Sequence, residues 1–381
     1  MSYAHASSTF ISNSSIELSS SAFAHNVATY KKLIGSADLG IVIKANGYGH
    51  GFNEIILLTK DNPDIAWYFT ASLSEALHIR SLGISKPILV MSIIDADPLL
   101  AFEQNIRLIF HQQEQFAHLE RARAHGLHPR IHMKIDTGLS RFGFLPHECA
   151  TVMKQLQSMP HVLLEGIFTH FAQAELPDQT YTGLQSERFA TCIDELMQIT
   201  PIPFIHSHAT SASFLRKAQG TNLFRIGAGL YGLWPSHDVQ AHAEKKHNLT
   251  LKQILTWKTH IINTRTIPAR TPIGYGCTYT AQHTMRIAKL PVGYADGYQR
   301  RLSNVGKVLI GDRLAPIVGR VGMNSITIDI TDIPQALLGS QVTLTGPHAG
   351  ITALDLAHAI GGFNPREIVT GIVCNNREIV F

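Results

Sequence analysis

The chain has 381 residues, 45% of them hydrophobic and 16% charged, which is ordinary for a globular protein large enough for two domains. Its formal net charge is +4, with no long run of Lys and Arg and no basic stripe interleaved with aromatic residues. Nucleic acid is therefore not an expected partner, whereas a mildly basic chain suits small anionic ligands.

The four cysteines, Cys149, Cys192, Cys277 and Cys374, are far apart and form no CxxC pair. Reduced thiols in a cytoplasmic protein account for them most simply. The 21 histidines are scattered without HExxH spacing, so we expect no metal site. Residues 1–26 lack the charged start and apolar run of a signal peptide, and no segment is long and apolar enough to span a bilayer. We expect a cytoplasmic protein with no membrane partner.

Short apolar strands alternate with helical stretches over the first two thirds of the chain. The expected strands cover residues 39–45, 67–71, 87–92, 107–111, 130–136, 163–170, 204–208 and 222–227. One intervening helix begins with a capping box at 72–75 and ends before Gly83, and another, at 112–125, is amphipathic and stops at Gly126.

Eight strands alternating with helices favour parallel pairing and a closed (β/α)8 barrel of the TIM type. A doubly wound open sheet is the alternative architecture. Such a sheet would bind its ligand through a Gly-rich first turn, and no GxGxxG follows any expected strand.

The pattern changes after about residue 232. Residues 237–249 are polar, rich in His and short of apolar periodicity, which predicts a linker. Beyond it we expect strands at 254–267, 285–292, 307–310, 315–321, 325–330 and 341–345, and one helix at 353–360. The sequence therefore predicts a barrel domain at 1–240 and a smaller, mostly β domain at 241–381.

The most informative segment is residues 41–51, where β-branched residues lead into Lys44 and a glycine-rich turn that contains Tyr48. An amine at the end of a buried strand is a candidate Schiff-base nucleophile, because burial lowers the pKa of an amine. The alternative is a strand-end lysine whose head group reaches solvent.

Reactive side chains collect at the expected C-terminal strand ends, which line the active site of a barrel. Lys44, Lys134 with Arg141, His170, Ser211 and Arg225 all fall there. A barrel rim with this many cationic groups is expected to bind an anionic ligand, and phosphate is the natural candidate. Ser211 and the amides that follow Arg225 are plausible phosphate donors, although a turn serine and a structural salt bridge remain the alternative roles of Ser211 and Arg225.

A lysine able to form an imine beside a phosphate site on a barrel points to pyridoxal phosphate. At this point the chain resembles the alanine racemase family, the barrel-type (fold III) pyridoxal-phosphate enzymes, over nearly its whole length. The matching motifs are 44–51 (Lys-Ala-Asn-Gly-Tyr-Gly-His-Gly), 134–141 (Lys-Ile-Asp-Thr-Gly-Leu-Ser-Arg), 164–171 (Leu-Glu-Gly-Ile-Phe-Thr-His-Phe), 225–232 (Arg-Ile-Gly-Ala-Gly-Leu-Tyr-Gly), 274–276 (Gly-Tyr-Gly), 293–298 (Gly-Tyr-Ala-Asp-Gly-Tyr) and 318–324 (Val-Gly-Arg-Val-Gly-Met-Asn).

The resemblance implies a two-base mechanism. Lys44 would hold pyridoxal 5'-phosphate as an internal aldimine and then remove the α-proton of the D-amino acid. Tyr275 would serve the L-amino acid from the opposite face. In the family this tyrosine comes from the partner subunit, which implies a homodimer with shared active sites. Without the resemblance, Tyr275 would be interpreted as a hairpin aromatic in a glycine turn.

The resemblance also assigns cofactor contacts. Arg225 would face the pyridine nitrogen and, being unable to give up its proton, would favour simple proton exchange over transamination and decarboxylation. His170 would pack beside the ring. The phosphate would be held by the side chains of Tyr48 and Ser211 and by the amides of Gly227 and Ala228.

The substrate contacts implied by the resemblance involve both domains. Arg141 would contact the cofactor oxygen and the substrate carboxylate, and the Met323 amide would contact that carboxylate from the other subunit. Lys134 is often carbamylated in the family, which converts a cation into an anion that braces Arg141.

Three positions depart from the family pattern. Thr210 replaces an Asn before Ser211, and Asn324 replaces an Asp after Met323. Arg366 takes the place of a tyrosine that binds the phosphate, and an arginine can bind phosphate as well.

The leading hypothesis is a racemase that interconverts L- and D-alanine for peptidoglycan. A broad-specificity or serine-preferring racemase of the same design is the second hypothesis. A non-catalytic pyridoxal-phosphate carrier would resemble the barrel alone, and a decarboxylase is disfavoured by Arg225.

Overall fold

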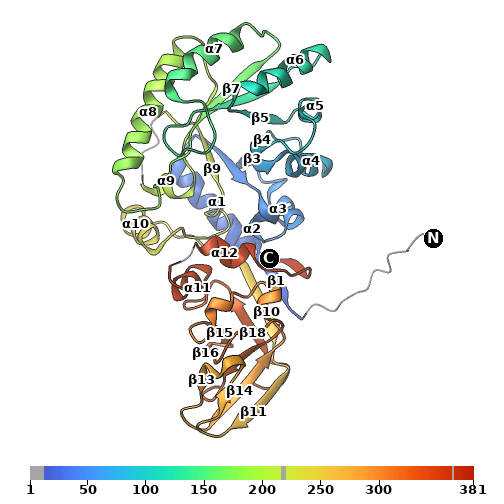
Figure 1. Ribbon diagram of the computed structural model, residues 1–381, viewed down its shortest axis with the longest axis vertical. Helices are drawn as coiled ribbons and strands as arrows, with labels where there is room; N and C mark the ends of the chain where they lie inside the picture. The colour runs from blue at the N-terminus through green and yellow to red at the C-terminus, as the bar shows by residue number, and fades with distance from the viewer. Residues whose placement is uncertain (1–12, 216–219, 363) are drawn as a thin grey trace, which may run out of the picture. The chain divides into compact units, whose positions relative to one another are not determined.

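The computed structural model describes residues 13–215, 220–362 and 364–381 (Figure 1). The chain divides into two compact units. The barrel unit comprises Ser21–Lys252, and the β unit comprises Gln253–Phe381 together with the described residues up to Ser20. The expected domains, 1–240 and 241–381, differ from these units at both ends of the barrel. Residues 1–12 of the N-terminal segment, 1–26, for which we expected no signal peptide, lie outside the described residues.

The barrel unit contains an eight-stranded sheet in which each hydrogen-bonded pair of strands is parallel (Figure 1). The strands, in their order across the sheet, are β8 (Phe204–His206), β7 (Leu163–Phe168), β6 (Arg130–Lys134), β5 (Arg107–Phe110), β4 (Ile88–Ile93), β3 (Ile65–Ser72), β2 (Asp38–Val42) and β9 (Leu223–Ile226).

The two outer strands of this sheet meet and close the barrel. The amide of Asn222 donates to the carbonyl of Ile205 at 3.0 Å, and that of Arg225 donates to the carbonyl of His208 at 3.0 Å. The predicted (β/α)8 architecture is thus confirmed. All eight expected strands are present, with ends that differ by a few residues.

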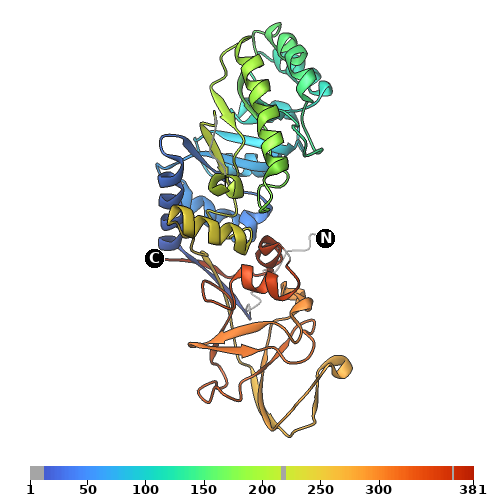
Figure 2. The same cartoon turned by 90° about the vertical axis from the view of Figure 1, so that its left-hand side faces the viewer.

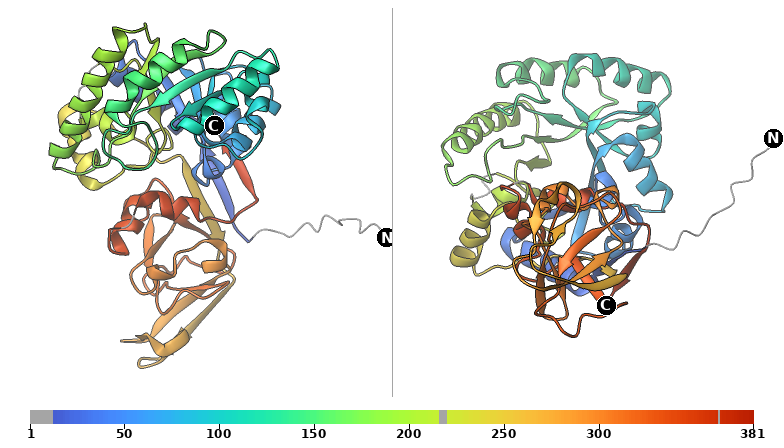
Figure 3. Two further views of the ribbon diagram at one scale, coloured as in Figure 1. Left: turned by 45° about the horizontal axis from the view of Figure 1, so that its top comes forward. Right: turned by 60° about the horizontal axis from the view of Figure 1, so that its bottom comes forward.

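Helices lie around the outside of these strands (Figure 3). They are α1 (Ser20–Ile34), α2 (Ala45–Tyr48), α3 (Phe52–Thr59), α4 (Leu73–Ser81), α5 (Pro98–Glu103), α6 (Phe116–Ala124), α7 (Cys149–Gln157), α8 (Thr180–Met197), α9 (Thr210–Leu215) and α10 (His237–His247), with short 3-10 helices at Gln113–Gln115 and Pro146–Glu148. The longest is α8, which runs along the outside of the strands in Figure 2.

The local signals at two of these helices are confirmed. Ser72 and Glu75 form the predicted capping box of α4, and Gly83 follows that helix with φ +81°. Gly126, with φ +68°, follows α6. Both glycines adopt the left-handed conformation that ends many helices.

The predicted linker at 237–249 is wrong, because most of it forms α10. Ser236 caps this helix by accepting the amide of Val239 at 3.2 Å, and Asn248 ends it with φ +50°. Only Val239 and Ala243 are buried along it. Two apolar residues four positions apart are too few to give an amphipathic pattern in the sequence.

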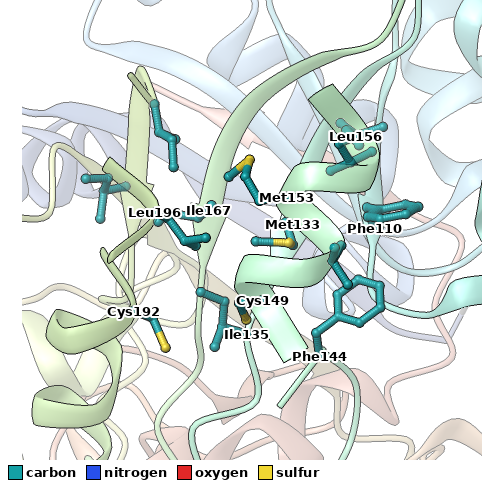
Figure 4. Close-up of a cluster of buried hydrophobic side chains, with 14 of the residues drawn as sticks. Phe110, Met133, Ile135, Phe144, Cys149, Met153, Leu156, Ile167, Cys192 and Leu196 are labelled. Atoms are coloured by element: carbon teal, nitrogen blue, oxygen red, sulfur yellow. The ribbon is translucent and has the colours of Figure 1, made fainter. Parts of the chain in front are cut away.

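The barrel packs a large hydrophobic cluster between its strands and its outer helices (Figure 4). Met133 and Ile135 from the β6 side contact this cluster, as do Met153 of α7 and Leu196 of α8. Each of these side chains is fully buried. The cluster anchors the half of the barrel that carries β6 and β7.

The β unit contains two sheets and a hairpin. Its six-stranded sheet has the order β16 (Arg313–Pro316), β15 (Lys307–Ile310), β18 (Gln341–Thr345), β10 (Leu255–His260), β1 (Ser15–Ser19) and β19 (Arg377–Val380). Its three-stranded sheet consists of β11 (Asn263–Ile267), β14 (Met285–Leu290) and β17 (Ile326–Asp329), and its hairpin of β12 (Pro272–Ile273) and β13 (Tyr279–Thr280). The helices are α11 (Ala353–Ala359) and α12 (Pro365–Thr370), with 3-10 helices at Tyr275–Cys277, Tyr294–Asp296 and Arg300–Leu302.

Several features of this mostly β unit differ from expectation. The strand predicted at 315–321 overlaps β16 only at its first two residues, because β16 ends at Pro316. The single strand predicted at 254–267 is two strands, β10 and β11, in different sheets. A second helix, α12, follows the predicted α11 and is capped by Asn364 with Pro365 in its first turn. Most notably, β1 pairs antiparallel with β10 and parallel with β19, so a strand from the start of the chain completes this unit.

No helix among the described residues combines the length and the apolar character that a membrane span requires.

A substitution at Gly40 of β2 can test how tightly the barrel is packed. A Cβ at this position would lie 2.2 Å from the Phe69 ring and 2.9 Å from the Trp67 Cβ. We expect Gly40→Ala to destabilise the barrel unit by about 1–3 kcal/mol through overpacking. Urea unfolding followed by Trp fluorescence measures the change. The exposed-site control Lys154→Ala should stay within about 0.5 kcal/mol of the parent, and equal midpoints for both variants would contradict the packing.

Candidate active site

The C-terminal ends of the barrel strands bring the predicted cationic groups onto one rim. Lys134 ends β6, His170 lies two residues after β7, and Arg225 lies in β9, one residue before its end. Lys44 lies two residues after β2, and not in the strand as predicted. Parallel strands of a barrel direct these ends to the same face, which is where barrel enzymes bind their ligands.

An uncommon left-handed turn follows Lys44. Ala45, Asn46, Gly47 and Tyr48 have φ values of +50°, +54°, +61° and +55°. Left-handed backbone costs roughly 1–2 kcal/mol for each residue with a side chain, so the surroundings must hold the turn in place.

Glu75, at the start of α4, supplies part of that support. Its Oε1 accepts the amide of Ala45 at 3.0 Å, while its Oε2 accepts the amides of Ala71 and Ser72 at 2.9 and 3.2 Å. One carboxylate therefore ties the Lys44 turn to the end of β3. The Lys44 amine lies 5.8 Å from the centre of the Tyr48 ring.

Two of the predicted phosphate contacts, Tyr48 and Gly227, lie close together at this turn. A Cβ on Gly227 would lie 2.3 Å from the Tyr48 hydroxyl, so only glycine permits this approach. Within the described residues, nothing accepts the amides of Gly227 and Ala228. Ser211 lies in the first turn of α9, directly after the strand-end segment that follows β8.

Thr210 has a definite role in this loop. Its hydroxyl accepts the amide of Gly229 at 3.1 Å. The threonine thereby fixes the backbone immediately after Gly227 and Ala228. The departure from the family's asparagine therefore keeps a side-chain oxygen where the turn uses one.

Arg225 is 2% exposed, and its guanidinium is almost fully engaged. Its Nη1 donates to the His206 Nδ1 at 2.9 Å and to the His206 carbonyl at 2.7 Å. Its Nη2 donates to the Thr169 carbonyl at 2.8 Å and to the His170 Nδ1 at 3.3 Å. These contacts use four of the five N–H groups and leave the Nε–H for a ligand.

Burial and the neighbouring Arg141 shift the titration of this group. They lower the pKa of Arg225 to about 9, which leaves the guanidinium charged at neutral pH. Burial, followed by the charges of Arg225 and Arg141, also holds the pKa of His170 well below its usual value. A neutral His170 that accepts at Nδ1 carries its proton on Nε2, and it is therefore a hydrogen-bond donor at that nitrogen.

The loop from Lys134 to Arg141 is folded around one carboxylate. The Asp136 Oδ1 accepts the amides of Gly138, Leu139 and Ser140 at 2.9, 2.8 and 3.2 Å. Burial alone would raise the pKa of Asp136, but these hydrogen bonds outweigh burial and lower the pKa below its usual value.

Helix α8 clamps the same loop from outside. Tyr181 donates to the Gly138 carbonyl at 2.7 Å, and Arg188 donates to the Thr137 carbonyl at 3.0 Å. Arg141 emerges from this loop with an exposed side chain. The predicted substrate-binding arginine is therefore carried on a braced backbone.

Lys134 is the most unusual amine of the rim. It is 2% exposed, and its Nζ has no hydrogen-bond partner among the described residues. Burial and the charges of Arg225 and Arg141 outweigh the attraction of Asp136 and lower the pKa of Lys134 to about 8. The predicted like-charge environment of this lysine is thus present.

Two of the remaining predicted residues occupy turns of the β unit. Tyr275 lies between Gly274 and Gly276, whose φ values are +74° and +72°. A Cβ on Gly276 would lie 3.2 Å from the Arg320 guanidinium carbon, so this arginine packs against the tyrosine turn. The side chains of Tyr275 and Met323 are 77% and 56% exposed.

Arg366 lies in the first turn of α12. Its Nε donates to the Oδ1 of Asn364 at 2.6 Å, and the same oxygen accepts the Arg366 amide at 3.0 Å. The cap of α12 therefore also orients the arginine that stands in place of the family's tyrosine. Its phosphate contact stays a prediction.

Several acidic groups that organise the barrel were not predicted from the sequence, among them Glu75, Asp136 and Glu165. The capping box identified Glu75 only as a helix start, and Asp136 was quoted only as part of a motif. Glu165 lies in β7 and is buried. A buried acid in a strand needs hydrogen-bond partners, so its presence in the sequence could have indicated a polar network inside the barrel.

Comparisons with known proteins cover both units. The family description "Alanine racemase, N-terminal domain" matches residues 18–235, and "Alanine racemase, C-terminal domain" matches residues 254–379. The chain belongs to the alanine racemase family. It is 36% identical to the alanine racemase of Halothermothrix orenii over 364 residues, or 93% of each protein, and 37% identical to alanine racemase 2 of Oceanobacillus iheyensis over 89% of this chain and 86% of the relative.

Solved structures of the family agree with this assignment. The alanine racemase of the D-cycloserine producer Streptomyces lavendulae superposes with a TM-score of 0.89 at 26% identity, over 97% of each chain. The biosynthetic alanine racemase of Pseudomonas aeruginosa gives a TM-score of 0.85 at 29% identity, over 97% of this chain and 99% of its own.

The Asp136 loop gives a testable consequence. Asp136→Ala removes the acceptor of three amides and should destabilise the barrel unit by about 1–2 kcal/mol, whereas Asp136→Asn retains an acceptor oxygen and should cost less. Because the folded-state pKa of Asp136 is lowered, its contribution is present above the unfolded value of about 3.9 and is lost as pH falls through the folded value. Urea midpoints at pH 7 and at pH 3 measure both effects. An alanine variant as stable as the asparagine variant at pH 7 would refute this role.

Proposed function

We propose that this chain interconverts L- and D-alanine with pyridoxal 5'-phosphate as its cofactor. The observation that carries this proposal is the match of both units to alanine racemase domains, together with close relatives of that name over nearly the whole chain. The barrel unit would bind the cofactor, and the β unit would supply the second base.

The residues at the rim fit this cofactor. The open amides of Gly227 and Ala228 and the hydroxyls of Tyr48 and Ser211 are suitable donors to a phosphate. The unused Arg225 Nε–H is suitable for the ring nitrogen.

Three other groups would complete cofactor binding. The Lys44 amine would form the covalent attachment, His170 would pack beside the ring, and Arg366 would add charge to the phosphate site. When bound, pyridoxal phosphate withdraws electrons from the substrate's α-carbon and so acidifies its α-proton.

The two proposed bases act on opposite faces of the substrate. Lys44 removes or returns the α-proton on the face of the D-isomer, and Tyr275 does so on the face of the L-isomer. Arg141 and the Met323 amide hold the substrate carboxylate and thereby keep the α-carbon between the bases. Arg225 donates to the ring nitrogen and retains its proton, which favours return of the α-proton over other outcomes.

The exposure of Tyr275 supports a homodimer. A base that is 77% exposed stands in bulk water, where it is poorly suited to remove a carbon-bound proton. Met323 is similarly exposed. We propose that these residues complete the active site of a partner subunit, so that each site is shared between two chains.

The cellular role follows from the chemistry of the product. We propose that the protein works in the cytoplasm and supplies D-alanine to peptidoglycan. The free thiols of all four cysteines suit a reducing compartment, and one structural relative is a biosynthetic alanine racemase. A small amino acid is the substrate partner.

Exchange in deuterated water tests the two-base assignment. In the parent protein, both isomers of alanine should racemise and take up α-deuterium. Tyr275→Phe should slow racemisation roughly a hundredfold to ten-thousandfold, while D-alanine still exchanges its α-proton through Lys44 and L-alanine does not. Polarimetry and mass spectrometry follow the two processes.

The matched control is Tyr279→Phe, four residues from the proposed base in the same unit. It should racemise alanine like the parent. Equal loss of exchange from both isomers in Tyr275→Phe would contradict the assignment of faces, and a higher kcat/KM for serine than for alanine would overturn the substrate.

Carbamylation of Lys134 is the modification that best suits its surroundings. The amine is buried, partly deprotonated near neutral pH and lies among cations, and these conditions favour reaction with carbon dioxide to give an anion. We propose that the resulting carbamate braces Arg141.

Labelled bicarbonate tests this modification. A 13C carbamate signal should appear in the parent protein and should grow as pH rises through about 8, because only the neutral amine reacts. Lys134→Arg should abolish the signal. Lys86→Arg should retain it, because Lys86 is also an amine of lowered pKa but donates to the carbonyls of Thr59 and Asn62. A signal unchanged in Lys134→Arg would disprove the site.

A further inference from the structure

The interior of the barrel contains a continuous hydrogen-bonded chain behind Arg225. The Arg225 Nη1 lies 2.9 Å from the His206 Nδ1, and the His206 Nε2 lies 2.8 Å from the His132 Nδ1. The His132 Nε2 in turn lies 3.4 Å from the Glu165 Oε2. Both imidazoles are completely buried, and Arg225 and Glu165 are 2% and 5% exposed.

The two ends of this hydrogen-bonded series, Arg225 and Glu165, determine which nitrogen of each imidazole carries the proton. A guanidinium only donates, so the His206 Nδ1 must be the acceptor and the His206 Nε2 must carry the proton. That N–H can point only to a bare His132 Nδ1, which leaves the proton of His132 on Nε2. The carboxylate of Glu165 only accepts, and it receives this last N–H.

Charge placement supports the same arrangement. A second proton on His206 or His132 would set one N–H against another at a buried contact. Burial, supported by the charge of Arg225, holds the pKa of His206 well below its usual value, and burial likewise lowers the pKa of His132 against the attraction of Glu165. Both rings are therefore neutral, as this series of hydrogen bonds requires.

Glu165 is itself held as a carboxylate. Arg107 donates to both of its oxygens, through Nε at 2.7 Å and Nη2 at 3.0 Å, and Arg130 donates to its Oε1 at 3.0 Å. Burial works against ionisation, but the hydrogen bonds of His132 and Arg107 outweigh it and lower the pKa of Glu165. With donors from Arg107, Arg130 and His132, Glu165 is stable as a carboxylate.

We propose that Glu165 is a positioning residue for Arg225, acting through the fixed tautomers of His132 and His206. The unprotonated His206 Nδ1 accepts one Nη1 hydrogen of Arg225. This contact fixes the orientation of the guanidinium, so that its Nε–H is the donor that faces the ligand. This inference rests on the proposed function, in which Arg225 contacts the cofactor ring.

Glu165→Gln distinguishes this role from a purely structural one. The Oε1 position faces two donor-only groups, the Nη2 of Arg107 and the Nη1 of Arg130, so the amide oxygen should take that position. The amide nitrogen would then take the Oε2 position, beside His132 and the Nε–H of Arg107. An N–H at that end inverts both tautomers and sets a His206 N–H against Arg225. Arg130→Gln is the matched control, because it removes one ionic partner of Glu165 while leaving the carboxylate to accept from His132.

The primary readout is 15N NMR of histidine-labelled protein, whose ring nitrogens report the tautomer directly and without cofactor. In the parent, His132 and His206, assigned with single His→Gln variants, should each show a bare Nδ1 and a protonated Nε2. Glu165→Gln should reverse this pattern, and Arg130→Gln should preserve it. The reversed variant should also lose kcat on the order of tenfold or more and change the visible absorption of the bound cofactor, with Arg130→Gln close to the parent in both.

Other tautomers or an imidazolium in the parent protein would overturn the proposal, even if the Glu165 variant does not fold. Equal losses of kcat in Glu165→Gln and Arg130→Gln, with unchanged spectra, would also overturn it in favour of a structural salt bridge. Predicted tautomers in a parent protein that racemises no amino acid would support the hydrogen-bonded chain and count against the proposed function, so the two failures are distinguishable.

Discussion

The buried positive charge of Arg225 is the constraint on which the rest of the site depends. A guanidinium at 2% exposure is tolerable only if its N–H groups are satisfied, and here strand-end carbonyls and two imidazoles satisfy four of them. The same contacts join β9 to β8 and to the residues after β7. The barrel is therefore closed on the side where Arg225 is held.

The rim also contains a strained backbone segment beside Lys44. A left-handed turn with three non-glycine residues follows Lys44 directly and is tied to α4 by the Glu75 carboxylate. Such a turn is retained where the surrounding structure determines it, and it presents Tyr48 to Gly227 at a distance no side chain would allow. Backbone strain at this point is the cost of bringing the Tyr48 hydroxyl close to the Gly227 backbone.

Local sequence patterns predicted the barrel and its cationic rim well, because strand ends in a parallel barrel share one face whatever their spacing in the chain. Lys44, Lys134, His170 and Arg225 were placed on that basis. The same reasoning could not identify the partners of these groups, since Glu165 meets His132 and Arg107 only through the order of strands across the barrel. Helix α10 was missed because its two buried residues give no periodicity, and α12 because its apolar face is only a few residues long.

The place of β1 could not be predicted either, because its pairing spans the whole chain. The strand lies between β10 and β19, and β19 contributes almost the last residues of the sequence. During synthesis the barrel unit, Ser21–Lys252, is a contiguous segment that can begin to fold early, whereas the pairing of β1 with β19 must wait until β19 has been made. Without β19, β1 would become the edge of the six-stranded sheet and would present one row of unpaired backbone groups, which is a site for pairing with other chains.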